Sequence, residues 1–219
     1  MTVHRFGGGL AVVRTQAEHA AALEELQRIV FPTLAPEQRF RADHYQKHVE
    51  LFPDGQLCVV EEATGRVVGM TSTIRLDFHF DHPGHTFADV IEGGWLTSHQ
   101  PGGRWLYGAD LGTHPDFRKR GIARALYAAR HGVVHRFGLA GQVTVGMPSG
   151  FGAVKHELTA ERYYAELVAG EREDPTVSAQ RAIGFELRGL LPDYLDDPVC
   201  DRYGVVLVLP AERDVRYPP

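Results

Sequence analysis

The stretch "HPDFRKRGIARALYAARH", residues 114–131, decides the fold because a basic turn runs directly into an apolar helical pattern. Before it, residues 104–113 read "RWLYGADLGT" and predict a strand. After it, Gly138 is placed to cap the helix. One face of that helix carries apolar side chains at helical spacing: Ile122, Leu126, Ala129, Val133 and Phe137. The sequence therefore predicts a strand, a short turn and an amphipathic helix.

The basic turn lies where a helix begins, and backbone N–H groups there have no partner within the helix. Those donors and the helix dipole attract anions, and Arg118, Lys119 and Arg120 add positive charge that suits phosphate. Gly121 lets the backbone approach a ligand, and Ala123 keeps the same surface small. The turn matches neither the GxxxxGK[ST] loop nor the three-glycine dinucleotide fingerprint.

Three interpretations of this turn are open: a phosphate cradle, a nucleic-acid patch and a solvated helix start. Cations at a helix N-terminus oppose the dipole, which favours a site that holds an anion. The 219 residues contain 23 Lys and Arg against 28 Asp and Glu, a net charge of -5 that disfavours nucleic acid as partner.

The rest of the composition indicates where the protein works. Cys58 and Cys200 are the two cysteines, and their spacing suggests no metal site, which fits a reducing compartment. No stretch has the apolar length needed to span a membrane, and the start of the sequence has no signal-peptide pattern. We therefore expect a cytoplasmic protein without a membrane partner.

Alternating strand and helix patterns predict one α/β domain over residues 1–219. Residues 1–9 are expected to be a flexible lead-in, and residues 79–103 and 148–174 to be two long excursions. Strands are predicted at 10–15, 56–62, 66–78, 104–113, 142–147, 185–189 and 203–209. Helices are predicted at 16–31, 36–52, 120–138, 159–170 and 174–184, the last with Asp174 as N-cap and Pro175 at its first position.

The segment "LGTHPDFRKRGIARAL", residues 111–126, resembles the acetyl-CoA-binding motif of the GNAT superfamily of N-acetyltransferases. Arg118, Gly121 and Ala123 match its pattern of Arg or Gln, two residues, Gly, one residue, and Gly or Ala. Downstream, "DPTVSAQRAIGFELRGLLPDYL", residues 174–195, resembles the superfamily's closing helix, "GF" turn and following strand. The order of elements agrees from residue 10 to residue 210.

The resemblance implies a single-domain GNAT-like fold, a mixed central sheet of about seven strands with helices on both faces and two long insertions. The insertions, about 79–103 and 148–174, resemble those of a GNAT group sometimes fused to a carbon–nitrogen hydrolase domain. We expect no such domain within these 219 residues. The resemblance also allows a homodimer, as many GNAT relatives form one.

A mechanism follows from the same resemblance, with acetyl-CoA as co-substrate. The backbone of Leu111, Gly112 and Thr113 would pair with the pantetheine arm like an added strand. The thioester would lie where the strands at 104–113 and 142–147 splay apart, and a primary amine of a small molecule or lysine side chain would attack it. The pyrophosphate would be held by backbone N–H groups of Arg118, Lys119, Arg120, Gly121, Ile122 and Ala123.

One position departs from the family pattern. Many relatives have a Tyr four residues before the "GF" glycine as the acid for the leaving thiolate, and this chain has Gln180 there. Gln can donate a hydrogen bond to the cofactor but cannot deliver a proton, so another Tyr or water would have to do so. Gln180 therefore also motivates an alternative function, a CoA-binding sensor or a non-catalytic GNAT domain.

Asp110 and Tyr107 are the candidate catalytic residues on the strand at 104–113. Their odd spacing directs them to opposite faces, so at most one of them faces a given pocket. Asp110 is the better base, and its alternative role is a structural carboxylate that caps a loop.

Histidines and carboxylates gather in "DFHFDHPGH", residues 77–85, and raise the possibility of a metal site. The spacing of His79, His82 and His85 matches no metal site, and polar loops collect His and Asp without a metal. We therefore expect no metal.

Overall fold

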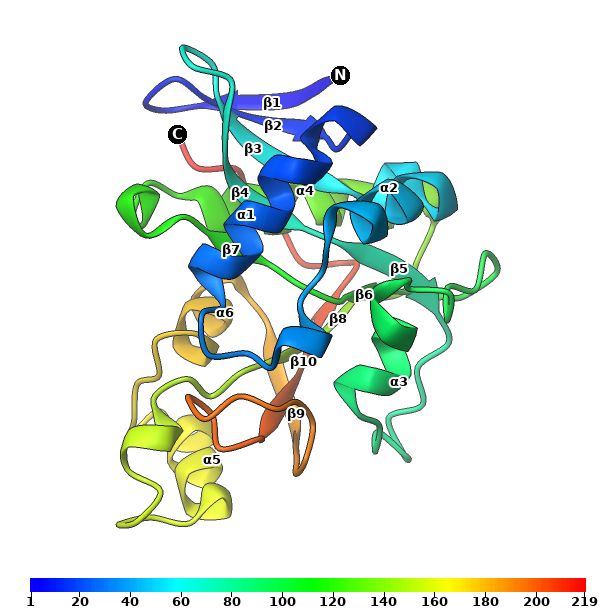
Figure 1. Ribbon diagram of the computed structural model, residues 1–219. Coiled ribbons are helices and arrows are strands. Elements are labelled where there is room, and N and C mark those ends of the chain that lie inside the picture. Colours follow the sequence, from blue (N-terminus) through cyan, green and yellow to red (C-terminus); the bar gives the residue numbers. More distant parts are fainter.

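The computed structural model describes residues 1–219 and contains two five-stranded sheets (Figure 1). The first sheet is antiparallel throughout, in the order β1 (Thr2–Phe6), β2 (Leu10–Arg14), β3 (Leu57–Glu61), β4 (Arg66–Thr71) and β7 (Gly112–Thr113). The second sheet has the order β5 (Thr73–Leu76), β6 (Trp105–Gly108), β8 (Gly141–Gly146), β10 (Gly204–Pro210) and β9 (Glu186–Leu191). Within it β6 and β8 are parallel and the other pairs are antiparallel.

The GNAT-like α/β fold agrees with the sequence, but ten strands replace the expected seven. Two of the expected strands change sheets partway along. The strand at 66–78 bends at Ser72 into β4 and β5, and the strand at 104–113 breaks at residues 109–111 into β6 and β7. The Ser72 carbonyl accepts the N–H of Ala109 at 3.0 Å, so both strands cross between the sheets at one level.

The remaining additional strand is β1, which lies in the segment predicted to be a flexible lead-in, and that prediction is wrong. Thr2–Phe6 pairs with β2 across a turn at residues 7–9, which makes β1 the edge of the first sheet. Glycine freedom in "GGG" serves this tight turn, where Gly8 and Gly9 have positive φ angles of 78° and 70°.

Helices cover both faces of the first sheet. A Cβ placed on Gly69 of β4 would lie 2.5 Å from the side chain of Ile122, at the start of α4 (Ile122–Phe137). A Cβ placed on Gly112 of β7 would lie 2.9 Å from Val30, at the end of α1 (Ala20–Val30). Gly112 pairs with Met70, the residue after Gly69, and successive side chains of a strand point to opposite faces. So α4 packs on one face, and α1 with α2 (Ala42–Leu51) lies on the other.

Three predicted helices begin at least three residues later than expected, and the one predicted at 16–31 starts as a 3₁₀ turn at Ala17–His19 that leads into α1. Residues 36–38 form a separate 3₁₀ turn, and α2 starts only at Ala42 because Arg39 and Arg41 have extended backbone. The closing helix α6 (Val177–Ile183) has Thr176, not Asp174, as its N-cap. The Asp174 carboxylate instead accepts the N–H groups of Thr176 and Val177 at 2.9 and 2.8 Å.

Both excursions contain helices. In the second, α5 (Ala160–Ala169) begins at Thr159 and ends at Gly170 as predicted. Tyr163 of α5 donates its hydroxyl to Asp174 at 2.9 Å, which fastens this excursion to the start of α6. In the first, α3 (Phe87–Ile91) is a short helix with a Thr86–Asp89 capping box that the sequence analysis missed.

The C-terminal segment, residues 211–219, returns along α4 toward β1 (Figure 1). His131 of α4 hydrogen-bonds the Arg213 carbonyl at 2.9 Å, and the Tyr217 ring stacks on His4 with centroids 3.8 Å apart. The Pro219 carbonyl accepts the N–H of Gly7 at 3.1 Å. The segment therefore covers the beginning of α4. None of the helices is both long and apolar enough to cross a membrane.

Gly108 and Gly132 provide a matched test of this packing. A Cβ on Gly108 would overlap the buried guanidinium of Arg130, whereas a Cβ on Gly132 of α4 would meet no atom within 4 Å. We expect Gly108→Ala to lower the free energy of unfolding by about 1–3 kcal/mol, because the core around Arg130 must shift. Gly132→Ala should raise it by about 0.5–1 kcal/mol through helix propensity. Urea denaturation measures both, and equal midpoints would contradict the packing at Gly108.

Candidate active site

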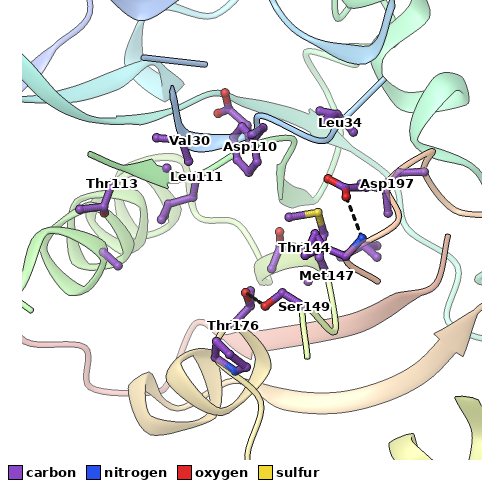
Figure 2. Close-up of a pocket in the computed structure, with 18 of the residues that line it drawn as sticks. Val30, Leu34, Asp110, Leu111, Thr113, Thr144, Met147, Ser149, Thr176 and Asp197 are labelled. Atoms are coloured by element: carbon purple, nitrogen blue, oxygen red, sulfur yellow. Dashed lines mark hydrogen bonds between the residues drawn. The ribbon is translucent and has the colours of Figure 1, made fainter. Parts of the chain in front are cut away.

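A cleft of about 770 Å³ lies where β6 and β8 part. The two strands pair as far as Gly108 and Thr144, where the Thr144 hydroxyl donates to the Gly108 carbonyl at 3.0 Å. Beyond that level β7 pairs with β4, while the last residues of β8 pair only with β10. Residues 111–113 and 144–147 thus form the two banks of the cleft (Figure 2). The strands splay where the family resemblance implied a gap.

One end of the cleft lies at the beginning of α4 and is lined by Arg118 and Ala123. Lys119 and Gly121 have positive φ angles of 63° and 81°, which turn the backbone sharply before the helix. The N–H groups of residues 119–124 donate to no acceptor of the chain, since the first helical bond runs from Ala125 to the Gly121 carbonyl. Arg118, Lys119 and Arg120 are exposed around these donors. This end can hold a phosphate group.

The predicted cofactor-binding residues divide into two groups. Six of them line the cleft: Leu111, Gly112, Thr113, Arg118, Ala123 and Gln180. Lys119, Arg120, Gly121 and Ile122 do not line it. The guanidinium of Arg120 lies 4.8 Å from the centre of the Phe117 ring, and the side chain of Ile122 is buried under α4. These four can face a phosphate mainly through their backbone N–H groups.

The space beside Gly121 differs from the expectation of close ligand approach. A Cβ there would lie 2.8 Å from Pro218 of the C-terminal segment. Glycine at this position therefore serves the positive φ angle and the packing of that segment.

Asp110 lies on the wall of the cleft, within the break between β6 and β7 (Figure 2). One carboxylate oxygen accepts hydrogen bonds from Gln27 at 2.9 Å and Tyr45 at 3.3 Å, and the other accepts the N–H of Ser72. Burial raises the pKa of Asp110 to about 6, although the Ser72 N–H and the charge of Arg130 act in the opposite direction. The carboxylate therefore has the basicity of a proton acceptor that works near neutral pH.

Arg130 is the buried cation beneath this part of the cleft, and the sequence analysis missed its role. Its guanidinium makes no hydrogen bond within the chain and lies 5.2 Å from the centre of the Tyr127 ring. In the sequence, Arg130 is four residues after Leu126, on the apolar face of the helix. A charge on a buried helical face was the available signal.

Tyr107 cannot contact a ligand in the cleft. Its side chain is fully buried, and it lines a separate pocket of about 230 Å³. Its hydroxyl is 2.7 Å from Nε2 of His85 and 2.9 Å from the hydroxyl of Tyr194. Of these three residues, Tyr194 lines the cleft. The break at residues 109–111 turns Asp110 to the cleft and leaves Tyr107 behind its wall.

Gln180 is joined to Tyr127 of α4, a pairing of residues 53 positions apart that the sequence did not indicate. The Gln180 amide donates to the Tyr127 hydroxyl at 2.8 Å, and both side chains line the cleft. The approach depends on Gly146 of β8, because a Cβ there would overlap the Gln180 side chain. Burial raises the pKa of Tyr127, so its hydroxyl keeps its proton at neutral pH.

The other end of the cleft is formed by both excursions and the β9–β10 loop. Ser149 and Thr176 face each other there with hydroxyls 2.7 Å apart, and Asp197 accepts the N–H of Val199 at 3.0 Å (Figure 2). Three charged residues line the cleft: Arg118 at the end beside α4, and Asp110 and Asp197 farther along. The histidines and carboxylates of residues 77–85 do not form a group of three that could hold a metal ion.

Comparisons with known proteins agree with this geometry. The chain is 29% identical over 204 residues to a protein of Bacillus subtilis named probable hydrolase YhcX, and it covers 39% of that protein's length and 93% of its own. It is 28% identical to the uncharacterized N-acetyltransferase YkwB of Bacillus subtilis, over 84% of this chain and 81% of YkwB. The solved structure of the GNAT-like decarboxylase GphF in complex with isobutyryl-CoA superposes with a TM-score of 0.76 at 19% identity, over 92% of this chain and 99% of GphF.

The family model of the acetyltransferase (GNAT) family matches residues 20–137, from α1 through β6 and β7 to the end of α4. This match includes the basic turn, the break at residues 109–111 and the bank at 111–113. The chain belongs to the GNAT acetyltransferase family.

Proposed function

We propose that the protein transfers an acetyl group from acetyl-CoA to a primary amine of a small molecule or a lysine side chain. The observation that carries the proposal is the continuous cleft, which runs from Arg118 and Ala123 at the beginning of α4 past the parted strands to Asp110. The name of YkwB as an N-acetyltransferase supports acyl transfer, and the isobutyryl-CoA in the GphF complex supports a CoA thioester as co-substrate.

The co-substrate would lie along the cleft in one direction. Its pyrophosphate would accept hydrogen bonds from the N–H groups of residues 119–124, with Arg118 adding charge beside the cleft. Its pantetheine arm would pair with residues 111–113, because β7 pairs with β4 on one edge and faces the cleft with the other. The thioester would then lie between the two banks.

Proton transfer in the proposed reaction is divided between Asp110 and Tyr127. The amine nitrogen attacks the thioester carbonyl carbon, and the C–S bond breaks as the amide forms. The Asp110 carboxylate takes a proton from the nitrogen, and the Tyr127 hydroxyl, which Gln180 holds, gives a proton to the leaving thiolate. Gln180 thus replaces the missing Tyr indirectly, by orienting a Tyr from the neighbouring helix.

The charges in the cleft favour an amine over a carboxylate as the reacting partner. Asp110 and Asp197 line the part of the cleft beyond the parted strands, and the lining cation Arg118 lies at the phosphate end. An acyl group with a free carboxylate, as a decarboxylase would bind, meets like charge there, whereas an ammonium group meets opposite charge. Since GphF resembles this chain at 19% identity, its decarboxylase chemistry is not carried over.

A CoA-binding sensor without transferase activity is the second candidate, and Gln180 at the usual Tyr position motivates it. The two functions differ in one observable, since both bind CoA but only the enzyme releases free CoA in the presence of an amine.

A screen of primary amines with acetyl-CoA, read out as free thiol, tests the proposal. We expect at least one amine to release CoA at a rate that rises as pH increases through about 6, where the Asp110 carboxyl ionises. Asp110→Asn should lower kcat by about 10²–10⁴, because its amide cannot take a proton. Binding of acetyl-CoA without release of thiol for any amine would favour the sensor, and no binding would contradict both.

Asp110→Asn should also change stability, in the opposite direction to activity. A carboxyl that ionises near pH 6 in the folded chain and near pH 4 in the unfolded chain lowers the free energy of unfolding by on the order of 2–3 kcal/mol above pH 6. The raised pKa favours folding below about pH 4, and this advantage is lost as pH rises through about 6. The variant should therefore unfold at higher urea than the wild type at pH 8.

Gln27 can provide a hydrogen-bond acceptor for the amide of Asn at position 110. Its amide oxygen has no hydrogen-bond partner, so a rotated Gln27 amide can accept from the new Asn. The difference in unfolding free energy should vanish near pH 4, and a variant less stable than the wild type at pH 8 would contradict the cost assigned to Asp110.

Tyr127→Phe tests the proton donor. The variant removes only a hydroxyl, so we expect kcat to fall by about 10–100-fold while the Kd for CoA stays within about threefold. Tyr164→Phe is the control, because Tyr164 is on α5 and does not line the cleft. Unchanged kcat in Tyr127→Phe would assign the thiolate proton to another group.

A further inference from the structure

Three side chains connect the cleft with the separate pocket of about 230 Å³. Tyr194, in the β9–β10 loop, lines the cleft, and its hydroxyl is 2.9 Å from that of Tyr107 on β6. The Tyr107 hydroxyl is 2.7 Å from Nε2 of His85, which belongs to the first excursion. His85 and Tyr107 both line the second pocket. The reaction proposed above uses none of these groups.

The hydrogen bonds that link His85, Tyr107 and Tyr194 have a fixed direction. Nδ1 of His85 is 2.6 Å from the Pro83 carbonyl, which can only accept, so Nδ1 carries the proton of the neutral ring. Nε2 must then accept from the Tyr107 hydroxyl. The Tyr107 oxygen in turn accepts from the Tyr194 hydroxyl. With its proton directed to Tyr107, the Tyr194 hydroxyl has only acceptor lone pairs left for a further partner.

The surroundings hold all three groups in place. Tyr107 and Tyr194 are 0% and 3% exposed, and the His85 ring packs edge-on against both with centroids 5.6 and 5.5 Å away. The Tyr194 carbonyl accepts the N–H of Phe87 at 2.7 Å, which joins its loop to the start of α3. Such enclosed rings cannot exchange partners without moving the excursion.

We propose that the Tyr194 oxygen accepts an N–H of the acceptor amine, with Tyr107 and His85 as positioning residues that keep it in the accepting orientation. This proposal rests on the proposed function, since it names the group that orients the amine in the same cleft. An amine held through one N–H directs its lone pair away from that bond, which is the alignment that attack on a thioester requires. The first excursion thereby acquires a role in the reaction, through His85.

The orientation depends on the charge of His85. A protonated ring donates from Nε2, so Tyr107 would donate to Tyr194 and Tyr194 would present a proton to the cleft. Burial lowers the pKa of His85 below its ordinary value, while the Pro83 carbonyl and the carboxylate of Asp89 act against this, so the ring is neutral at pH 8. The other titratable groups around His85 are Tyr107 and Tyr194 and, in the same pocket, Asp77, His79 and His82.

His85→Gln separates a positioning role from a structural one. The Gln amide oxygen can accept from Tyr107 as Nε2 does, but it cannot be protonated. We expect near-wild-type turnover at pH 8. In the acid range where the wild-type His85 ring takes up a proton, we expect a plot of log(kcat/KM) against pH whose slope is one unit smaller in the variant than in the wild type. The ionisation of the amine contributes equally to both proteins. His82→Gln, from the same pocket but outside the chain of hydroxyls, should keep the wild-type slope.

Tyr194→Phe tests the contact with the amine directly. We expect kcat/KM for the amine to fall by about tenfold, because an N–H loses its acceptor, while the Kd for acetyl-CoA is unchanged. An unchanged kcat/KM in Tyr194→Phe, or an unchanged acid slope in His85→Gln, would overturn the proposal.

NMR of the His ring nitrogens in the full chain makes the test independent of acyl transfer. We expect His85 to be protonated at Nδ1 and unprotonated at Nε2 at pH 8, with an altered Nε2 shift in Tyr107→Phe. An Nε2–H ring would overturn the inference even if acetyl transfer is observed. The expected ring state without any amine substrate would refute the proposed function and the amine contact of Tyr194 with it, and only the direction of the hydrogen bonds from Tyr194 to His85 would stand.

Discussion

The structure depends on the point where β6 and β8 stop pairing. The Thr144 hydroxyl bonds the Gly108 carbonyl at the last paired level, and the Ser72 carbonyl takes the N–H of Ala109 immediately beyond it. Glycine is required at 108 because the Arg130 guanidinium occupies the place of its side chain. Beyond this level the residues after β6 continue into β7 of the first sheet, while β8 stays in the second sheet. A cleft therefore opens between the two strands.

The break between β6 and β7 places the carboxylate of Asp110 in a buried position that is unfavourable for its charged form. Asp110 accepts three hydrogen bonds, yet burial still raises its pKa to about 6. The fold thus holds a group that is destabilising when charged, beside an Arg130 that has no hydrogen-bond partner. Groups held at such cost are typical of sites that move protons.

The sequence predicted the elements that depend on local pattern and missed those that depend on distant contacts. The apolar period of residues 122–137 and Gly138 defined α4, and Thr159 with Gly170 defined α5. Patterns along one strand could not show that residues 66–78 and 104–113 each serve two sheets, because Ser72 and Ala109 meet only in the fold. Likewise the motif indicated the end of the cleft at the beginning of α4, whereas the pairing of Gln180 with Tyr127 and the hydrogen bonds from Tyr194 to His85 join segments far apart in sequence.

We infer that the parted strands and the start of α4 form one binding site for a CoA thioester. Titration of the ¹⁵N-labelled full chain with CoA, followed through the backbone amide resonances, tests this inference. We expect the largest shifts at residues 119–124 and 111–113, with small shifts for the exposed N–H groups of α5. Saturating CoA that leaves the amides of residues 119–124 unmoved would contradict it.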